Sequence, residues 1–104
     1  MDGYKVITRK YTVSNPMGLD LWCVRQLVQK LWPFEAEVEV HYRCMRADGK
    51  SFLDMLAMGV NCGAQVEVSI FGREARQAQE AIQYLFNHAF ACEALPVISN
   101  PVVG

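Results

Sequence analysis

Residues 35–42 alternate between polar and apolar side chains without a break. This period of two is typical of a β-strand with one face in a core and the other in water, here with Val38, Val40 and Tyr42 pointing inward. Residues 5–13 and 63–70 are rich in β-branched and aromatic side chains and predict two more strands. A sheet with a single apolar face has to be covered, so other segments must supply the cover.

Two segments repeat apolar residues with the period of a helix. Residues 20–32 begin with Asp20 as a predicted N-cap and are ended by Pro33, and residues 73–91 form a second, longer segment. A short helix is predicted between Ser51, another N-cap, and Gly59. The apolar positions of the two long helices are Leu21, Val24, Leu27, Val28, Leu31, Ala75, Ala78, Ile82, Leu85, Phe86 and Ala89.

The order strand, helix, strand, strand, short helix, strand, helix predicts an α+β fold. We expect a four-stranded, mainly antiparallel sheet with three helices on one face. Residues 1–92 are expected to form one domain, and residues 93–104, which contain two prolines, an irregular tail. The position of one hairpin stays open, because the chain could turn at residues 43–45 or at Asp48-Gly49.

Composition narrows the class of protein. The formal net charge of −1 gives no general attraction to nucleic acid or to an anionic membrane. No apolar run approaches the roughly 18 residues that a membrane helix needs. The cysteines have neither C-x-x-C nor metal-ligand spacing, so we expect free thiols in a cytoplasmic protein, with no metal and no cofactor. They are Cys23, Cys44, Cys62 and Cys92.

Several short motifs lie at the borders of the predicted strands and helices. Residues 16–20 read Pro-Met-Gly-Leu-Asp at the start of the first helix. They are followed in order by Phe34, Lys50-Ser51, residues 58–60 (Met-Gly-Val) and residues 63–66 (Gly-Ala-Gln-Val). From residue 6 to residue 90 this series resembles HPr, the histidine-containing phosphocarrier family of the bacterial sugar phosphotransferase system. The resemblance implies the open-faced β-sandwich of that family.

The active loop departs from the family pattern, which is Asn-Gly-Leu-His, any residue, Arg-Pro. The resemblance places Asp20 at the position of the phosphoacceptor histidine, Trp22 at that of the arginine and Cys23 at that of the proline. A neutral imidazole is nucleophilic near pH 7 and leaves again readily, whereas a carboxylate is a weaker, charged group. We therefore assign no catalytic residue, and we expect His41 and His88 to be structural or to face solvent.

Asp20 has three interpretations. It is a plain N-cap, or a fixed negative charge that resembles a phosphorylated family member, or a phosphoryl acceptor. The last would form an acyl phosphate and would need a metal site and a lysine. Arg25, one turn further along the helix, is a candidate replacement for the lost arginine.

The resemblance also implies two sites away from the loop. Ser51 falls at the family's regulatory phosphoserine, although a plain N-cap explains it equally well. In the family the active loop and the short helix form the docking surface for partner proteins, and soft apolar side chains suit such a surface. The residues concerned, some of which could instead fill the core, are Trp22, Phe52, Leu53, Met55 and Met58.

We therefore expect a regulatory or adaptor protein that is not an enzyme and that acts through protein–protein contacts without histidine phosphotransfer. The implied partners are phosphotransferase-system components, a serine kinase or a transcription regulator, with no nucleic acid and no membrane. Two alternatives stay open. One is a phosphocarrier with a non-histidine acceptor such as Asp20, and the other is an oligomerisation module with an apolar interface around Trp22, Phe52 and the methionines.

Overall fold

The computed structural model describes residues 6–90 of the 104-residue chain. In chain order its elements are β1 (Val6–Thr12), α1 (Leu21–Leu31), β2 (Glu37–Tyr42), β3 (Met45–Asp48), α2 (Phe52–Ala57), β4 (Gln65–Phe71) and α3 (Ala75–Asn87). The predicted order of elements is confirmed. Cys92 and the expected tail, residues 93–104, lie outside the described residues.

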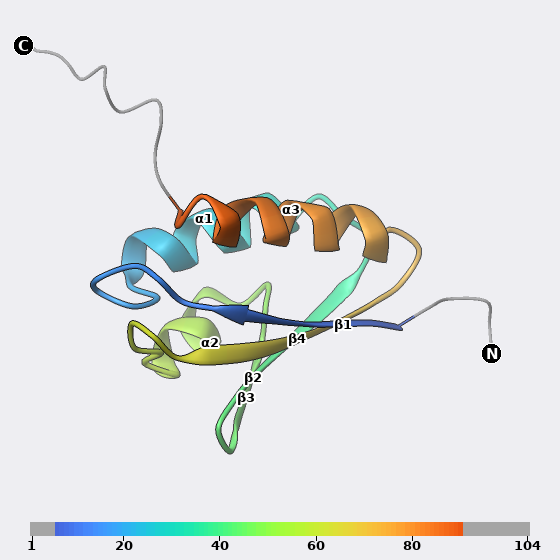
Figure 1. Cartoon of the computed structure of the whole chain (residues 1–104). Helices are drawn as coiled ribbons and strands as arrows, with labels where there is room; N and C mark the ends of the chain where they lie inside the picture. The colour runs from blue at the N-terminus through green and yellow to red at the C-terminus, as the bar shows by residue number, and fades with distance from the viewer. Residues whose placement is uncertain (1–5, 91–104) are drawn as a thin grey trace, which may run out of the picture.

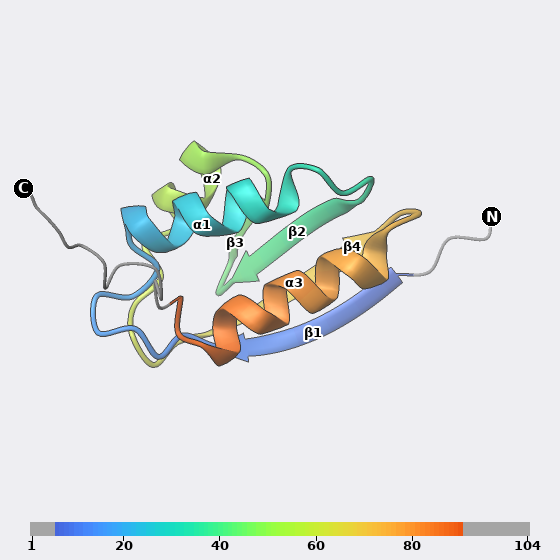
Figure 2. The same ribbon diagram turned by 90° about the horizontal axis from the view of Figure 1, so that it is seen from above.

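The four strands form one sheet in the order β1-β4-β2-β3, and every neighbouring pair is antiparallel. Helices α1 and α3 lie over the same face of the sheet (Figure 1), and from above α3 runs along β1 and β4 (Figure 2). Helix α2 packs against α1 and β3. The expected α+β class is confirmed, as an open sheet with helices on one side.

The core lies between the sheet and the helices. Alternate side chains of β2 and β4 point into it, as the sequence pattern predicted, and the same cluster takes in one stripe of α1 and one of α3. Within residues 6–90 no polar or charged residue is buried. The most completely buried large side chains of the core are Leu31, Met55, Ile70, Ile82, Val13, Val24, Val40, Val66, Val68 and Phe90.

The structure settles the open hairpin. Strands β2 and β3 are joined by Arg43 and Cys44, and Asp48-Gly49 instead lies where β3 leads into α2. Arg43 has a φ of 59°, and its guanidinium stacks 5.0 Å from the centre of the Tyr42 ring. In the sequence Asp48-Gly49 is the stronger local turn signal, and a turn with a positive φ at an arginine is uncommon.

Two helix predictions need correction. Leu21 was expected in the buried stripe of α1 but is 58% exposed, and Cys23 occupies the buried position instead. Helix α3 ends at Asn87 and not near residue 91, because Ala89 and Phe90 adopt φ values of 50° and 55°, which no right-handed helix continues.

The core packing makes a direct prediction. Ile82→Ala should lower the free energy of unfolding by about 3 kcal/mol, since the side chain is 1% exposed and its loss leaves a cavity. Urea unfolding measures this change. Glu80→Ala, on the exposed side of the same helix, is the control and should change stability by less than about 0.5 kcal/mol. Equal effects of the two substitutions would contradict the packing.

Candidate functional site

The candidate site is the loop of residues 13–20, which leads from β1 into α1. A second loop, residues 58–64 between α2 and β4, runs beside it (Figure 2). Three backbone hydrogen bonds join the two loops: Gly63 N–H to Val13 O at 2.7 Å, Val13 N–H to Ala64 O at 2.8 Å, and Leu19 N–H to Val60 O at 3.0 Å. The site is therefore fixed to the rest of the fold by main-chain contacts.

Gly18 is the tightest point of this loop. Its φ is +74°, a left-handed conformation that favours glycine, and its N–H donates to Asn15 O at 2.9 Å. A Cβ atom at this position would lie 2.2 Å from the carbonyl oxygen of Val60. Because that oxygen belongs to the backbone of the second loop, it has no freedom to move aside. Glycine at position 18 thus determines how closely the two loops approach and where α1 begins.

Asp20 is the N-cap of α1, as predicted. One of its carboxylate oxygens, Oδ1, accepts the Cys23 N–H at 3.1 Å, and its own carbonyl accepts the Val24 N–H at 2.9 Å. The first turn of a helix leaves N–H donors without partners, and a carboxylate also opposes the positive end of the helix dipole. Asp20 therefore supplies from within the chain the acceptor that a bound anion would otherwise provide.

These contacts act on two titrating groups. Hydrogen bonds from the backbone N–H groups, that of Cys23 above all, hold the pKa of the Asp20 carboxyl below its ordinary value. Burial, together with the nearby Asp20 carboxylate, raises the pKa of the Cys23 thiol to about 11. Near pH 7 the site consequently carries a carboxylate next to a neutral thiol, whose Sγ donates to Gly18 O at 3.7 Å.

The end of α3 closes the other side of the loop. The side-chain amide of Asn15 donates to Ala89 O, and Gln26 Nε2 on α1 donates to Phe90 O at 2.9 Å. Phe90 itself is 2% exposed and stacks edge-on against Phe86. Sequence reasoning missed this connection between residues far apart in the chain. The only signal was a pair of amide side chains, which many surface positions also carry.

Exposed apolar side chains lie on the loop before α1, on the first turn of α1 and on α2. Trp22 and Leu53 were expected there and are 43% and 74% exposed, and Phe52 is half-buried. Met17 and Leu21, at 77% and 58% exposed, were not expected. We call four of these side chains the apolar rim: Met17, Leu21, Trp22 and Leu53. Three of the four lie on α1 and α2, and these two helices pack against each other.

Met55 and Met58 require a correction. Both were proposed for the docking surface, but they are 1% and 5% exposed and belong to the core. Helix α2 has a single inward face, and Met55 lies on it opposite the exposed Leu53. These methionines therefore hold α2 against the sheet and present no surface to a partner.

A family model described as "PTS HPr component phosphorylation site" matches residues 7–88, nearly all of the folded region. The chain belongs to this HPr family. It is accordingly an HPr-like protein related to the phosphotransferase system, and proteins of this family interact with other components of that system.

Individual relatives give the same assignment. The chain is 32% identical over 78 residues to phosphocarrier protein HPr of Lysinibacillus sphaericus, covering 75% of this chain and 89% of that protein. It is 27% identical over 100 residues to the PEP-dependent dihydroxyacetone kinase phosphoryl donor subunit DhaM of Providencia stuartii, covering 96% of this chain but 21% of that longer protein. The crystal structure of HPr-C-His from Thermoanaerobacter tengcongensis matches with a TM-score of 0.74 at 24% identity, over 83% of this chain and 94% of that one, which supports the fold.

Ser51, the expected regulatory serine of this HPr-like chain, is the N-cap of α2. Its Oγ accepts the Asp54 N–H at 3.2 Å, and Asp54 lies in the first turn of the helix. The preceding Lys50 donates from Nζ to Phe34 O at 2.6 Å, which ties the start of α2 to the segment after α1. The capping role of Ser51 is confirmed, and its phosphorylation stays a prediction.

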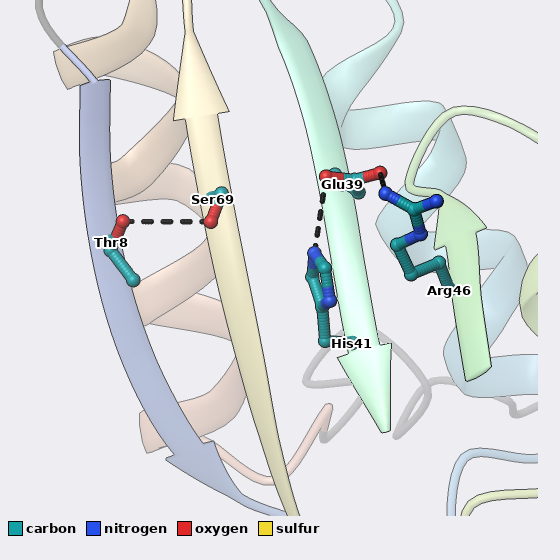
Figure 3. Close-up of polar contacts among 5 residues, drawn as sticks. All are labelled: Thr8, Glu39, His41, Arg46 and Ser69. Atoms are coloured by element: carbon teal, nitrogen blue, oxygen red, sulfur yellow. Dashed lines mark hydrogen bonds and ion pairs between the residues drawn. The ribbon is translucent and has the colours of Figure 1, made fainter. Parts of the chain in front are cut away.

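Within residues 6–90 neither histidine forms a hydrogen bond or ion pair with Asp20. His41 lies on the helix-free face of the sheet, where its Nε2 is 3.1 Å from Glu39 Oε1 (Figure 3). His88 follows α3, with Nδ1 2.8 Å from Tyr84 O and its ring against the Tyr84 ring. Each ring therefore has its own partner, Glu39 for His41 and the Tyr84 carbonyl for His88.

Other candidate chemistry can be reported briefly. In the described part of the chain no group of three or more His, Cys, Asp or Glu residues could hold a metal ion. No helix among residues 6–90 is long and apolar enough to cross a bilayer. Cys23 is buried, whereas Cys44 and Cys62 are exposed free thiols. Arg25 is exposed, and within residues 6–90 it forms no ion pair with Asp20.

The cap makes a pH-dependent prediction. Asp20→Ala should destabilise the protein by about 1 kcal/mol at pH 7, because the first turn of α1 loses its side-chain acceptor. The folded pKa lies below the ordinary 3.8, so the contribution of ionised Asp20 is complete above that value and is lost as the pH falls through the folded pKa. Urea unfolding of both proteins at pH 7 and at pH 3 measures the difference.

The control for this test is Asp20→Asn, since asparagine caps helices about as well as aspartate. Asp20→Asn should stay close to the parent protein at pH 7. A cost of Asp20→Ala that is the same at both pH values would show that the carboxylate charge contributes nothing to the cap.

Proposed function

We propose that this protein is a regulatory or adaptor member of the HPr family that has lost histidine phosphotransfer and acts by binding other proteins. The observation that carries the proposal is the carboxylate of Asp20 at the N-terminus of α1, in the place where the family resemblance puts the phosphoacceptor histidine. A working phosphocarrier needs both a nucleophile that releases phosphate readily and a site that stabilises the added negative charge.

The electrostatics of the helix start argue against a phosphoryl group. The Cys23 N–H, a donor that a phosphate at this position would use, is bonded to Asp20 at 3.1 Å. The pKa of the Asp20 carboxyl is lowered, so Asp20 is ionised at physiological pH and repels an incoming phosphate. The neighbouring Cys23 thiol, with a pKa of about 11, offers no thiolate as a substitute nucleophile.

The residue proposed for the arginine position supports the same function. Trp22 has no charge to stabilise a phosphate, but its 43% exposed indole adds to the apolar rim. Tryptophan is among the side chains most often found at the energetic centre of protein interfaces. The loop thus has side chains suited to a protein partner where the family has groups suited to phosphate, together with the fixed negative charge of Asp20.

Ser51 extends the proposal to regulation. The residue is half-exposed at the start of α2, and phosphate at a helix N-terminus gains from the N–H groups and the dipole. Asp54, one turn later, opposes that gain. A serine kinase and a transcription regulator are partners proposed on this basis, in a cytoplasmic setting, alongside phosphotransferase-system components.

Phosphotransfer provides the decisive experiment. Incubation with a purified bacterial Enzyme I and labelled phosphoenolpyruvate should leave no acid-labile phosphate on the chain, because no imidazole stands at the head of α1. The double variant Asp20→His, Trp22→Arg is the gain-of-function control and should accept label. Stoichiometric labelling of the parent protein would overturn the proposal and favour a phosphocarrier acting through Asp20 or another residue.

The docking surface has its own test, in which purified Enzyme I is titrated into ¹⁵N-labelled protein. The largest amide shifts are expected at the apolar rim. Trp22→Ala should weaken binding by about tenfold or more, as is usual for an interface tryptophan. The matched control is Trp32→Ala at the opposite end of α1, 68% exposed, which should leave affinity unchanged. Equal losses in the two variants would place the contact elsewhere.

A further inference from the structure

The face of the sheet turned away from the helices is uncovered within residues 6–90. Figure 3 shows Thr8, Ser69, Glu39, His41 and Arg46 side by side on this face, with the helices behind the strands. Glu39 lies between His41 and Arg46, 3.1 Å from the imidazole and 3.4 Å from the guanidinium. We call this the open face. It also contains Val6, Lys10, Thr12, Glu37, Asp48, Gln65, Glu67 and Phe71.

Charges on the open face are separated along the strand direction. The strand register places Glu39, Ser69 and Thr8 in one row with Asp48, and Glu37 lies one row further toward the same end. This end is acidic and carries a shallow groove of about 810 Å³. The groove lining contains the carboxylates of Glu37, Glu39 and Asp48, the cations of Arg46 and Lys50, and the exposed apolar side chains of Val6 and Phe71.

The other end of the open face is mainly basic. The next row in the register contains Lys10, His41 and Arg46, with Glu67 as the one acid among them. Arg43, in the turn after β2, lines a smaller hollow of about 210 Å³ together with Lys10 and His41. The boundary between the two ends runs across the strands at Val40 and Val68, which are paired with each other and point inward.

We propose that the open face is an interface between two copies of this chain, related by a two-fold axis along that boundary. Such an axis keeps each strand over its own counterpart and reverses the direction along the strands. On β2 it brings Glu37 over Arg43 of the second copy and Glu39 over His41 of the second copy. On β3 it brings Asp48 over Arg46 of the second copy.

The argument for a second copy is this self-complementarity. Two-fold interfaces place each surface patch on itself, so a face with one acidic end and one basic end satisfies both copies at once. Sheets that pack face to face keep their strands within about 30° of alignment, which preserves these pairings. The groove, whose lining has three carboxylates and two cations, gives the basic side chains of the second copy room to enter.

The chemistry of the face also determines how strong the dimer is. Its centre is polar, because Thr8, Ser69 and the charged side chains outnumber Val6 and Phe71, and removing paired charges from water offsets most of their attraction. We therefore expect a weak dimer, in the high micromolar range, that is sensitive to salt. The apolar rim lies at the helix side, so this inference is independent of the proposed function.

Sedimentation equilibrium of the full chain tests the proposal. At low ionic strength the protein should self-associate, and about 0.5 M salt should weaken the association by roughly tenfold, since the Debye length then falls well below 10 Å. Glu37→Lys should weaken it to a similar degree, because a two-fold interface contains each pair twice. Glu37 forms no ion pair within residues 6–90, so the fold should tolerate this change.

The charge swap gives the sharpest result. Arg43→Glu alone should weaken association as Glu37→Lys does, and the double variant Glu37→Lys, Arg43→Glu should restore it. Glu80→Lys on the exposed side of α3 changes the net charge equally and should have no effect. A monomer at all concentrations, or a double variant no better than the single ones, would overturn the proposal. So would a dimer that Trp22→Ala abolishes and Glu37→Lys leaves intact.

Discussion

The close approach of two loops at Gly18 is the constraint on which the site depends. Position 18 combines a φ of +74° with a backbone oxygen, Val60 O, only 2.2 Å from where a Cβ would lie. This contact directs the chain out of β1, across the end of the sheet and into α1 at a fixed point. Everything that the helix start can do, whether capping, binding or presenting side chains, follows from that placement.

At the start of α1 the chemistry depends on which group accepts hydrogen bonds from the first N–H donors of the helix. An intramolecular carboxylate accepts a hydrogen bond there and opposes the positive end of the helix dipole, whereas an open helix start remains available to a ligand. Asp20 is such an acceptor for the Cys23 N–H, and burial together with this carboxylate keeps the Cys23 thiol protonated. Under the proposed function, one side chain removes the phosphate chemistry while the geometry around the site is kept.

Much of this could be read from the sequence, because periodicity reports directly on burial. The alternation in β2, the caps at Asp20 and Ser51, and the ends of α1 were all predictable from local chemistry. The failures involve contacts between distant segments. Met55 and Met58 point into the core because of where α2 packs, and the hydrogen bond from Asn15 to Ala89 joins positions that no local pattern relates. Arg43 adopts a conformation that its residue type disfavours.

The two faces of the molecule are governed by different physics. At the start of α1, exposed apolar side chains adjoin the Asp20 carboxylate, so a partner there would gain affinity chiefly from apolar burial. On the open face, charges of both signs are separated along the strands, so association there depends on register and on salt. A sheet covered on one side only leaves these surfaces back to back. If both proposals hold, a partner at the apolar rim and a second copy on the open face use different surfaces and would not compete.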